Sequence, residues 1–423
     1  MSARPSSNSR TPPGEEGLRE ETSLVISDVT LLAGMDLEPV EHAEIGVSSG
    51  RIGRAGRADT VIDGRGLIAM PGLVNGHIHL NDAPLKDLGV GLPMDELIHP
   101  VSGLKRKGLE SIGEEARLEA MSSAVVEMVR GGITTAVNFH EEGSGIIRKL
   151  LSSTELSKVL VNLCRPATYF DQAGIERNEP YAGEEMEKFA SELRWFQGAG
   201  LSGTNEYSDS AMEQVSSAVA GLKAIHAAES GAAAMKSMRM TGQTEVERAI
   251  AHLSPDMLVH MTHAGREDIE LASAEKVSVV FCPRSNAILG NGMPKVREVI
   301  DCGIPAGLGT DNLMFNAPDM FREMDYTSRM LRGSAGDPSK IGSLEVLRMA
   351  TSSGAVAAGL GGRRGAIADG YDADIILLDA GGRLAGTHDI HSSIVHRATV
   401  ADVAGTIRGG RFLHRTDRIR VMK

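Results

Sequence analysis

The chain has 423 residues, a formal net charge of −12 and 41% hydrophobic residues. The acidic balance argues against nucleic acid as a partner, because phosphate binding needs clustered Lys and Arg. No apolar run is long enough to span a bilayer, which argues against a membrane partner. Cys164, Cys282 and Cys302 are too few and too scattered for a disulfide framework, so we expect a cytoplasmic protein.

The two ends of the chain differ from its middle. Residues 1–23 are rich in Ser, Pro, Arg and Glu and lack an apolar stretch, which predicts a disordered tail and not a signal peptide. Residues 24–70 and 365–423 are strand-rich, with apolar and β-branched runs broken by Gly and Asp. Because neither segment has a sizeable core of its own, we expect them to form one small composite β-sandwich domain.

Between these segments, over 71–364, strand patterns alternate with helical ones. The first helix is predicted by Leu118, Met121, Val125 and Met128, which recur at three- and four-residue steps before Gly131. A further helix or helix pair is predicted over 342–360. Eight strands alternating with helices are typical of the (β/α)₈ TIM barrel, an α/β fold. The eight strands are predicted over 71–79, 133–139, 159–166, 200–207, 222–229, 257–264, 277–285 and 304–311.

Polar residues of metal-ligand type stand at the ends of four of these strands. In a strand, positions two apart share a face, so His77 and His79 would present two imidazoles to one point. His226, His260 and Asp311 end the fifth, sixth and eighth strands. Catalytic groups of such barrels lie on the rim formed by the strands' carboxyl ends. Each residue also has an ordinary alternative, such as helix capping by Asp311. Their joint placement favours a metal site.

This constellation resembles the metal-dependent amidohydrolase superfamily. The matching segments are "PGLVNGHIH", "HMTHAGREDIELASAEKVSVVFCPRSN", "GIPAGLGTDN" and "GAIADGYDADIILLD". The resemblance implies one divalent metal ion per chain, Zn²⁺ or Fe²⁺, held by His77, His79, His226 and Asp311. His260 matches the histidine that binds the metal's water, and His263 falls on a less critical position. No lysine ends the third or fourth predicted strand, so a second, lysine-bridged metal is not expected.

The motif His226-Ala227-Ala228-Glu229 resembles the HxxE of the cytosine deaminase and triazine chlorohydrolase branch. There the glutamate protonates a ring nitrogen beside the carbon under attack, which makes that carbon a better electrophile. The catalytic residues implied are Glu229, His260 and Asp311. The implied reaction is deamination of an aminated aromatic N-heterocycle, such as a pyrimidine, purine or pterin, by attack of metal-activated water on a ring carbon. The alternative for Glu229 is a surface turn.

Candidate substrate contacts come from other predicted strand ends. Arg165 and Arg284 could clamp an anionic group or pair with a neighbouring acid. Asn286 matches a family position that shapes the pocket. The first-strand loop departs from the pattern of adenosylhomocysteine deaminases, which makes a nucleoside thioether doubtful. Six aromatic residues could form a rim around a stacked heterocycle or pack beneath the loops: Phe139, Tyr169, Phe170, Tyr207, Phe281 and Phe315.

Other functions remain open at this point. The same metal centre could release chloride from a ring or hydrolyse a cyclic amide. A non-catalytic scaffold is disfavoured because the residues matching the metal ligands, His260 and Glu229 are all present. The expected partner is a small heterocyclic substrate, and a homo-oligomer is compatible with the sequence.

Overall fold

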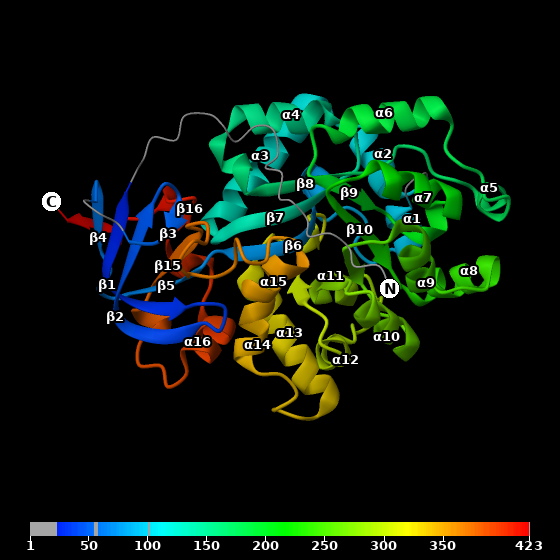
Figure 1. Cartoon of the computed structure of the whole chain (residues 1–423). Helices are drawn as coiled ribbons and strands as arrows, with labels where there is room; N and C mark the ends of the chain where they lie inside the picture. The colour runs from blue at the N-terminus through cyan, green and yellow to red at the C-terminus, as the bar shows by residue number, and fades with distance from the viewer. Residues whose placement is uncertain (1–22, 55–57, 100–101, 423) are drawn as a thin grey trace, which may run out of the picture.

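The computed structural model describes residues 23–54, 58–99 and 102–422. Apart from Ser23, the tail predicted over 1–23 lies outside them. Two nine-stranded sheets organise the described residues. In Figure 1 the parallel sheet lies in the middle of the molecule among helices, and the second sheet, at the left, joins segments from both ends of the chain.

The parallel sheet closes into a barrel through its last segment, which forms two short strands that pair with different neighbours. β13 pairs with β12, and β14, which follows on the same segment, pairs with β6 at the start of the barrel. The ends of the sheet are thereby joined, which confirms the predicted TIM barrel. Its strands are β6 (Leu73–His79), β7 (Ile133–His140), β8 (Leu160–Cys164), β9 (Gly198–Leu201), β10 (Leu222–Ala227), β11 (Met257–His260), β12 (Ser278–Phe281), β13 (Ala306–Leu308) and β14 (Asp311–Asn312).

Helices follow the strands as the alternation predicts. The periodic segment forms α3 (Glu114–Arg130), whose Met121, Val125 and Met128 are buried. The segment 342–360 forms the helix pair α14 (Ser343–Met349) and α15 (Ser352–Ala357). The remaining α-helices of the barrel are α4 (Ser144–Ser153), α6 (Gly183–Leu193), α7 (Asp209–Ala218), α9 (Glu245–Arg248), α10 (Arg266–Ala274), α12 (Val296–Asp301) and α13 (Met320–Ala335).

The segments that follow the carboxyl ends of the strands carry short helices of their own. The long loop predicted after the first strand is partly helical, with η1 (Leu80–Leu85), α1 (Met94–Ile98) and α2 (Leu104–Glu110). The others are α5 (Gln172–Glu176), η3 (Thr204–Glu206), α8 (Gly231–Thr241) and α11 (Pro283–Ile288). Outside this rim lie η2 (Glu155–Val159), η4 (Ala249–Leu253), η5 (Gly382–Leu384), η6 (Val400–Asp402) and α16 (Ile390–Arg397).

The fourth barrel strand is shifted from its predicted range. It was expected over 200–207, but β9 begins at Gly198 and ends at Leu201, and η3 follows. A Cβ at Gly198 would lie 2.0 Å from the carbonyl oxygen of Leu222, and one at Gly200 would lie 2.6 Å from the ring of Phe139. Only glycine permits this close approach, so the glycines belong to the strand and do not end it.

The second sheet confirms that the two ends of the chain build one side domain. β5 pairs antiparallel with β15, and β4 pairs antiparallel with β18. Ile26, Val47 and Ile375 lie in one buried cluster, so the segments share a core. The strands are β1 (Leu24–Ala33), β2 (Glu38–Ser48), β3 (Arg51–Ile52), β4 (Thr60–Asp63), β5 (Leu67–Pro71), β15 (Ile375–Asp379), β16 (Val403–Arg408), β17 (Arg411–Arg415) and β18 (Arg420–Met422).

Gly309, between β13 and β14, allows the barrel to close. A Cβ there would lie 2.7 Å from the Cβ of His77 and 2.8 Å from its backbone nitrogen. We expect Gly309→Ala to lower the free energy of unfolding by about 1–3 kcal/mol, the usual cost of overpacking a core. Thermal unfolding of the variant measures this. Gly145→Ala, in α4 with nothing within 4 Å of the added Cβ, is the matched control. Equal melting temperatures for the two variants would contradict the prediction.

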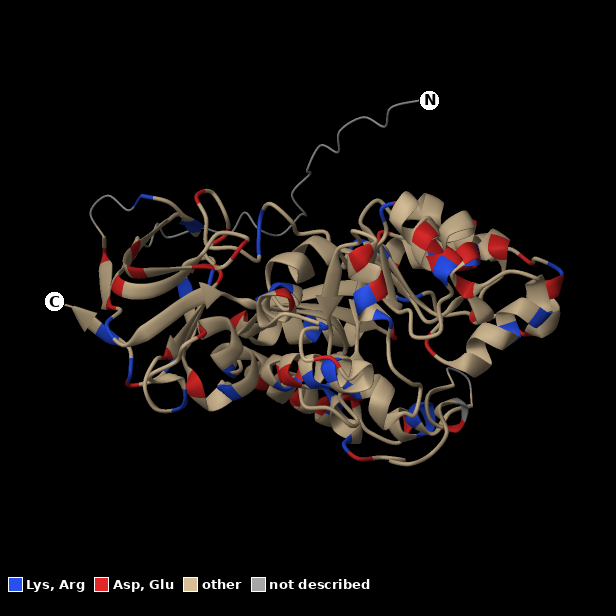
Figure 2. Ribbon diagram, turned by 90° about the horizontal axis from the view of Figure 1, so that it is seen from below, with Lys and Arg blue, Asp and Glu red and all other residues tan. Residues whose placement is uncertain are grey.

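The surface agrees with the mixed composition. Figure 2 shows Lys and Arg interspersed with Asp and Glu along the outer helices. Among the described residues, no helix is both long enough and apolar enough to cross a membrane.

Candidate metal and catalytic site

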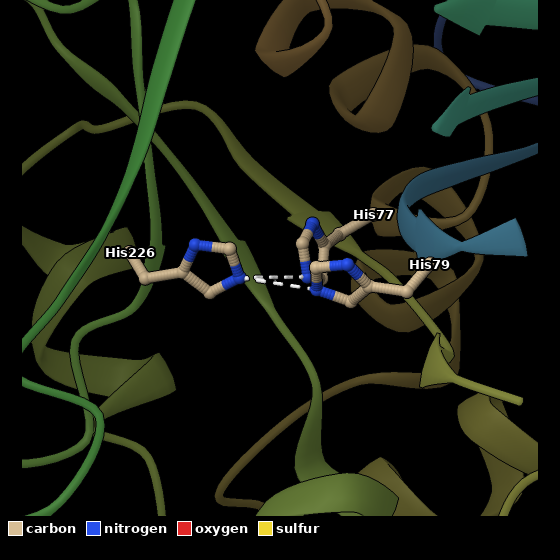
Figure 3. A group of neighbouring side chains, drawn as sticks. All are labelled: His77, His79 and His226. Carbon is tan, nitrogen blue, oxygen red and sulfur yellow. Dashed lines mark hydrogen bonds between the residues drawn. The ribbon is translucent and has the colours of Figure 1, made fainter. Parts of the chain in front are cut away.

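Four side chains of metal-ligand type meet at the carboxyl end of the barrel strands: His77 and His79 from β6, His226 from β10 and Asp311 from β14. Nε2 of His226 lies 3.2 Å from Nε2 of His77 and 3.3 Å from Nε2 of His79. Oδ1 of Asp311 lies 3.2 Å from Nε2 of His77 and 3.5 Å from Nε2 of His79. Figure 3 shows the three histidine rings, from two distant strands, turned toward one another.

These spacings fit a single ion. Bonds of about 2.0–2.1 Å in a tetrahedral arrangement place the ligand atoms roughly 3.3 Å apart. Nδ1 of His226 is hydrogen-bonded to the carbonyl oxygen of Leu201 at 2.8 Å, and Nδ1 of His79 lies 3.0 Å from Oε1 of Glu141. When these nitrogens carry the proton, both Nε2 atoms present lone pairs to the centre.

The protonation states also suit a metal. Burial lowers the pKa of His77 to about 3 and, with the neighbouring imidazoles, holds the pKa of His226 well below its ordinary value. Burial opposes ionisation of Asp311, but its hydrogen bond with His77 outweighs this and keeps its pKa well below the usual range. Neutral imidazoles beside an ionised carboxylate form a donor set ready for a divalent cation.

His260, at the end of β11, lies beside this group. Its Nδ1 is 2.9 Å from Oδ1 of Asn286, and the Asn286 amide nitrogen donates to Thr262, which orients the amide. Nδ1 therefore donates, which leaves Nε2 of His260 free to accept a proton. His260 and Asp311 both have left-handed backbones, with φ of 76° and 60°. Such conformations cost free energy and persist where the surroundings enforce them, often at functional sites.

Glu229, in the turn after β10, faces His260 across the site. Its Oε2 lies 3.6 Å from Nε2 of His260. The Asn291 amide nitrogen donates to Oε1 at 3.2 Å. Burial raises the pKa of Glu229, so the protonated carboxyl is more available than at an exposed glutamate. Glu229 does not sit in a surface turn, the alternative considered from sequence.

A cavity of about 680 Å³ opens over the group. His79, His226, His260, Glu229 and Asp311 all line it. The wall also includes Met94, Ile98, Lys105, Leu109, Glu141, Arg165, Tyr169, Asn205, Glu206, Ser230 and Lys236. Its size is within the range of small-molecule sites.

Two of the predicted substrate contacts, Arg165 and Tyr169, lie on this wall. Arg165 is paired with Glu141, its Nη1 2.9 Å from Oε1. Lys105 contacts the same carboxylate, at 2.8 Å, and also Asp82, at 2.9 Å. Arg165 therefore belongs to a buried charge network that reaches the candidate metal ligand His79 through Glu141.

Three other predicted contacts lie elsewhere. Asn286 contacts Nδ1 of His260 through its Oδ1 and does not line the cavity. Phe139 is fully buried, its ring centroid 4.3 Å from that of His77, so it packs beneath the candidate ligands. Arg284 is turned toward α13, where Nη1 lies 3.5 Å from Oε2 of Glu323. For the six aromatic residues the sequence left open a rim around the substrate or packing beneath the loops. Among the described residues, Tyr169 is the one of these six that lines the cavity, and Phe139, Tyr207 and Phe281 are buried in the core.

Glu323 gives a pH-dependent prediction. Burial, only partly opposed by Arg284, raises its pKa from 4.5 to about 8. The unfolded chain therefore loses this proton at lower pH than the folded chain, and stability falls as pH rises from about 4.5 to 8. Glu323→Gln removes the titration, so its melting temperature should gain on that of the wild type between pH 5 and 9. Exposed Glu267→Gln is the control. A difference that does not change with pH would contradict this.

Several supporting residues could not be found from sequence. Asn291 and Ser285 contact Glu229 and Asp311, the latter with Ser285 Oγ donating to Oδ2 at 2.5 Å. They reach the site only through tertiary packing. Glu141 could have been noticed, because it follows the second predicted strand in "NFHEE".

Comparison with known proteins agrees with this site. The model of the amidohydrolase family matches residues 68–413. A protein of Methanothermobacter thermautotrophicus named "Putative aminohydrolase" is 33% identical over 93% of this chain and 99% of its own. A 5-methylthioadenosine/S-adenosylhomocysteine deaminase of Moorella thermoacetica is 28% identical over 84% of each chain.

The fold is shared with a solved structure as well. An adenosine deaminase from Xanthomonas campestris with bound zinc superposes with a TM-score of 0.79 at 22% identity, covering 92% of each chain. The family predicted from the histidine and aspartate constellation and the four matching segments is thereby confirmed, and with it a hydrolase of carbon–nitrogen bonds. The chain belongs to the amidohydrolase family.

Proposed function

We propose that this protein is a metal-dependent deaminase of an amino-substituted aromatic N-heterocycle. The observation that carries the proposal is Glu229, a buried carboxyl with a raised pKa, 3.6 Å from His260 and on the wall of the ligand cavity. A proton donor at this place can activate a ring nitrogen, which hydrolysis of an ordinary amide does not require.

The metal we propose is one zinc or ferrous ion per chain, held by His77, His79, His226 and Asp311. The donor set of three imidazoles and one carboxylate suits either ion. When bound, such an ion lowers the pKa of a water to near neutrality and so supplies the nucleophile.

The residues of the chain would then move two protons. His260, through its free Nε2, and Asp311 orient the attacking water and accept a proton from it. Glu229 donates its proton to the ring nitrogen beside the attacked carbon. The proton taken from the water passes to the amino group, which leaves as ammonia. Glu229 recovers a proton from the hydroxyl at the attacked carbon, which becomes the carbonyl of the product.

The relatives support a substrate with an aminated ring. One is named as a deaminase of two adenine nucleosides, and the similar fold is that of an adenosine deaminase. The cavity of about 680 Å³ also leaves space beyond a bare ring. We therefore propose a pyrimidine, purine, pterin or a nucleoside of these as the substrate. The loop after the first strand argued against nucleoside thioethers, whereas the name of this relative favours them. Any test of the substrate must therefore include them.

Ammonia release tests the proposal. Protein refilled with zinc or with iron would be incubated with aminated pyrimidines, purines, pterins and their nucleosides, including thioether nucleosides, beside ring chlorides and cyclic amides. We expect ammonia from at least one aminated ring. Turnover of only chlorides or cyclic amides would contradict the deaminase and leave a hydrolase of another class. Metal-stripped protein is the control.

A further inference from the structure

A buried carboxyl outside the metal and proton-transfer groups touches the backbone that carries Glu229. Glu245, the first residue of α9, is 4% exposed. Its Oε2 accepts a hydrogen bond from the backbone N–H of Ala228 at 3.0 Å, and its Oε1 accepts one from the amide nitrogen of Asn205 at 3.2 Å. The chemistry of ring deamination does not need this side chain.

The bond to Ala228 acts at a strained position. Ala228 has φ of 51°, the left-handed region that residues with a Cβ rarely adopt. Its carbonyl oxygen accepts a hydrogen bond from the backbone N–H of His263 at 2.8 Å, so the backbone N–H and the carbonyl of Ala228 are both hydrogen-bonded. Because Glu229 is the next residue, the backbone angle at Ala228 decides where the Glu229 carboxyl points.

The other oxygen ties this turn to the cavity wall. Asn205, in η3, donates to Glu245 and also to the carbonyl oxygen of Ala233 in α8, at 2.9 Å. Asn205, Ala233 and Glu229 all line the cavity. One carboxyl thus connects the turn after β9, the turn after β10 and the first part of α8.

We propose that Glu245 is a positioning residue, which holds Ala228 in its left-handed conformation and so aims Glu229 at the substrate ring. The inference rests on the proposed role of Glu229 as proton donor. Glu245 is placed to do this without repelling its neighbours, since burial raises its pKa to about 8 and that of nearby Glu206 to about 7. Near neutral pH the Glu245 carboxyl is therefore mostly protonated and the Glu206 carboxyl about half protonated, which limits the repulsion between them.

Three variants separate positioning from simple stabilisation. Glu245→Ala removes both acceptors. Glu245→Gln keeps one oxygen that can accept from Ala228 but sets an amide nitrogen against the Asn205 amide. Glu247→Gln, on the same helix, is the control, since glutamine preserves its capping bond to Thr244. We expect kcat to fall about 10- to 100-fold in Glu245→Ala, as for other residues that orient catalytic groups. Glu245→Gln should recover only part of this loss, because it keeps the acceptor for Ala228 but loses the acceptor for Asn205. KM and metal content should stay close to wild type.

The deciding measurement repeats the substitutions in the Glu229→Gln background. If Glu245 acts through Glu229, Glu245→Ala and Glu245→Gln should then change the residual kcat less than about threefold, because effects on one functional unit do not multiply. An equal fold-loss in both backgrounds would overturn the proposal, as would unchanged kcat in Glu245→Ala. If Glu245→Ala does not fold, Glu245→Gln decides alone. The proposal is then supported if Glu245→Gln lowers kcat in the wild-type background and not in the Glu229→Gln background. Full turnover in Glu229→Gln itself would instead overturn the role of Glu229 as proton donor, on which this inference rests.

Discussion

Glu229→Gln should lose at least about 10²-fold in kcat, and as much as about 10⁴-fold, while metal content and substrate affinity stay near those of the wild type. Glutamine keeps the shape of the side chain and can still contact Asn291, but it cannot donate a proton and take it back. The loss should fall on kcat and kcat/KM together, because the missing interaction is made in the transition state.

The measurement is steady-state ammonia release on the best substrate of the panel, with metal analysis of each preparation. Glu247→Gln, exposed on α9, is the matched control for the same chemical change. Deamination by Glu229→Gln at near wild-type rates would mean that another group protonates the ring, and Glu206, on the same cavity wall, would be the next to test.

His226→Ala should behave differently, because it removes a proposed metal ligand and not the proposed proton donor. Changing residues that only orient metal ligands costs 10- to 100-fold in affinity, so loss of a ligand should weaken metal binding by more than about 100-fold. Activity should fall with occupancy. Metal per chain after dialysis measures this directly. The stabilisation of wild type by added zinc should also be lost, since it depends on binding to the folded chain.

The control for this change is His252→Ala. His252 lies in η4, outside the cavity, and contacts Glu213 at 2.9 Å. It should keep its metal and its zinc-dependent rise in melting temperature. If His226→Ala retained one ion per chain with unchanged affinity, the proposed ligand set would be wrong.

The sequence predicted the barrel and the groups that the structure brings together at its rim, because both are encoded locally. His77 and His79 alternate within one strand, and His226, His260 and Asp311 each follow an apolar run. Position along a strand is enough to place such residues on the same rim of a parallel barrel. The side domain was predictable for a similar reason: strand patterns without a core must find partners.

What lies around the rim was less predictable. Phe139 and Arg165 both lie at the ends of predicted strands, yet Phe139 packs under the candidate ligands and Arg165 reaches the cavity. Sequence position gives the height of a residue in the barrel but not which way a loop or a strand end turns it. The contacts of Glu245 and Asn291 depend on segments distant in sequence from Glu229 and follow only from tertiary packing.

The interrupted last strand also has a consequence for how the chain folds. Asp311 stands beside His77 only when β14 has paired with β6, across 234 residues of sequence. Contacts of such separation form late, because the entropy of closing the intervening loop must first be overcome. A metal that needs Asp311 therefore binds the closed ring in preference to an open one. Bound metal would therefore stabilise the closed barrel. The barrel would reopen more slowly as a larger share of the sites holds metal.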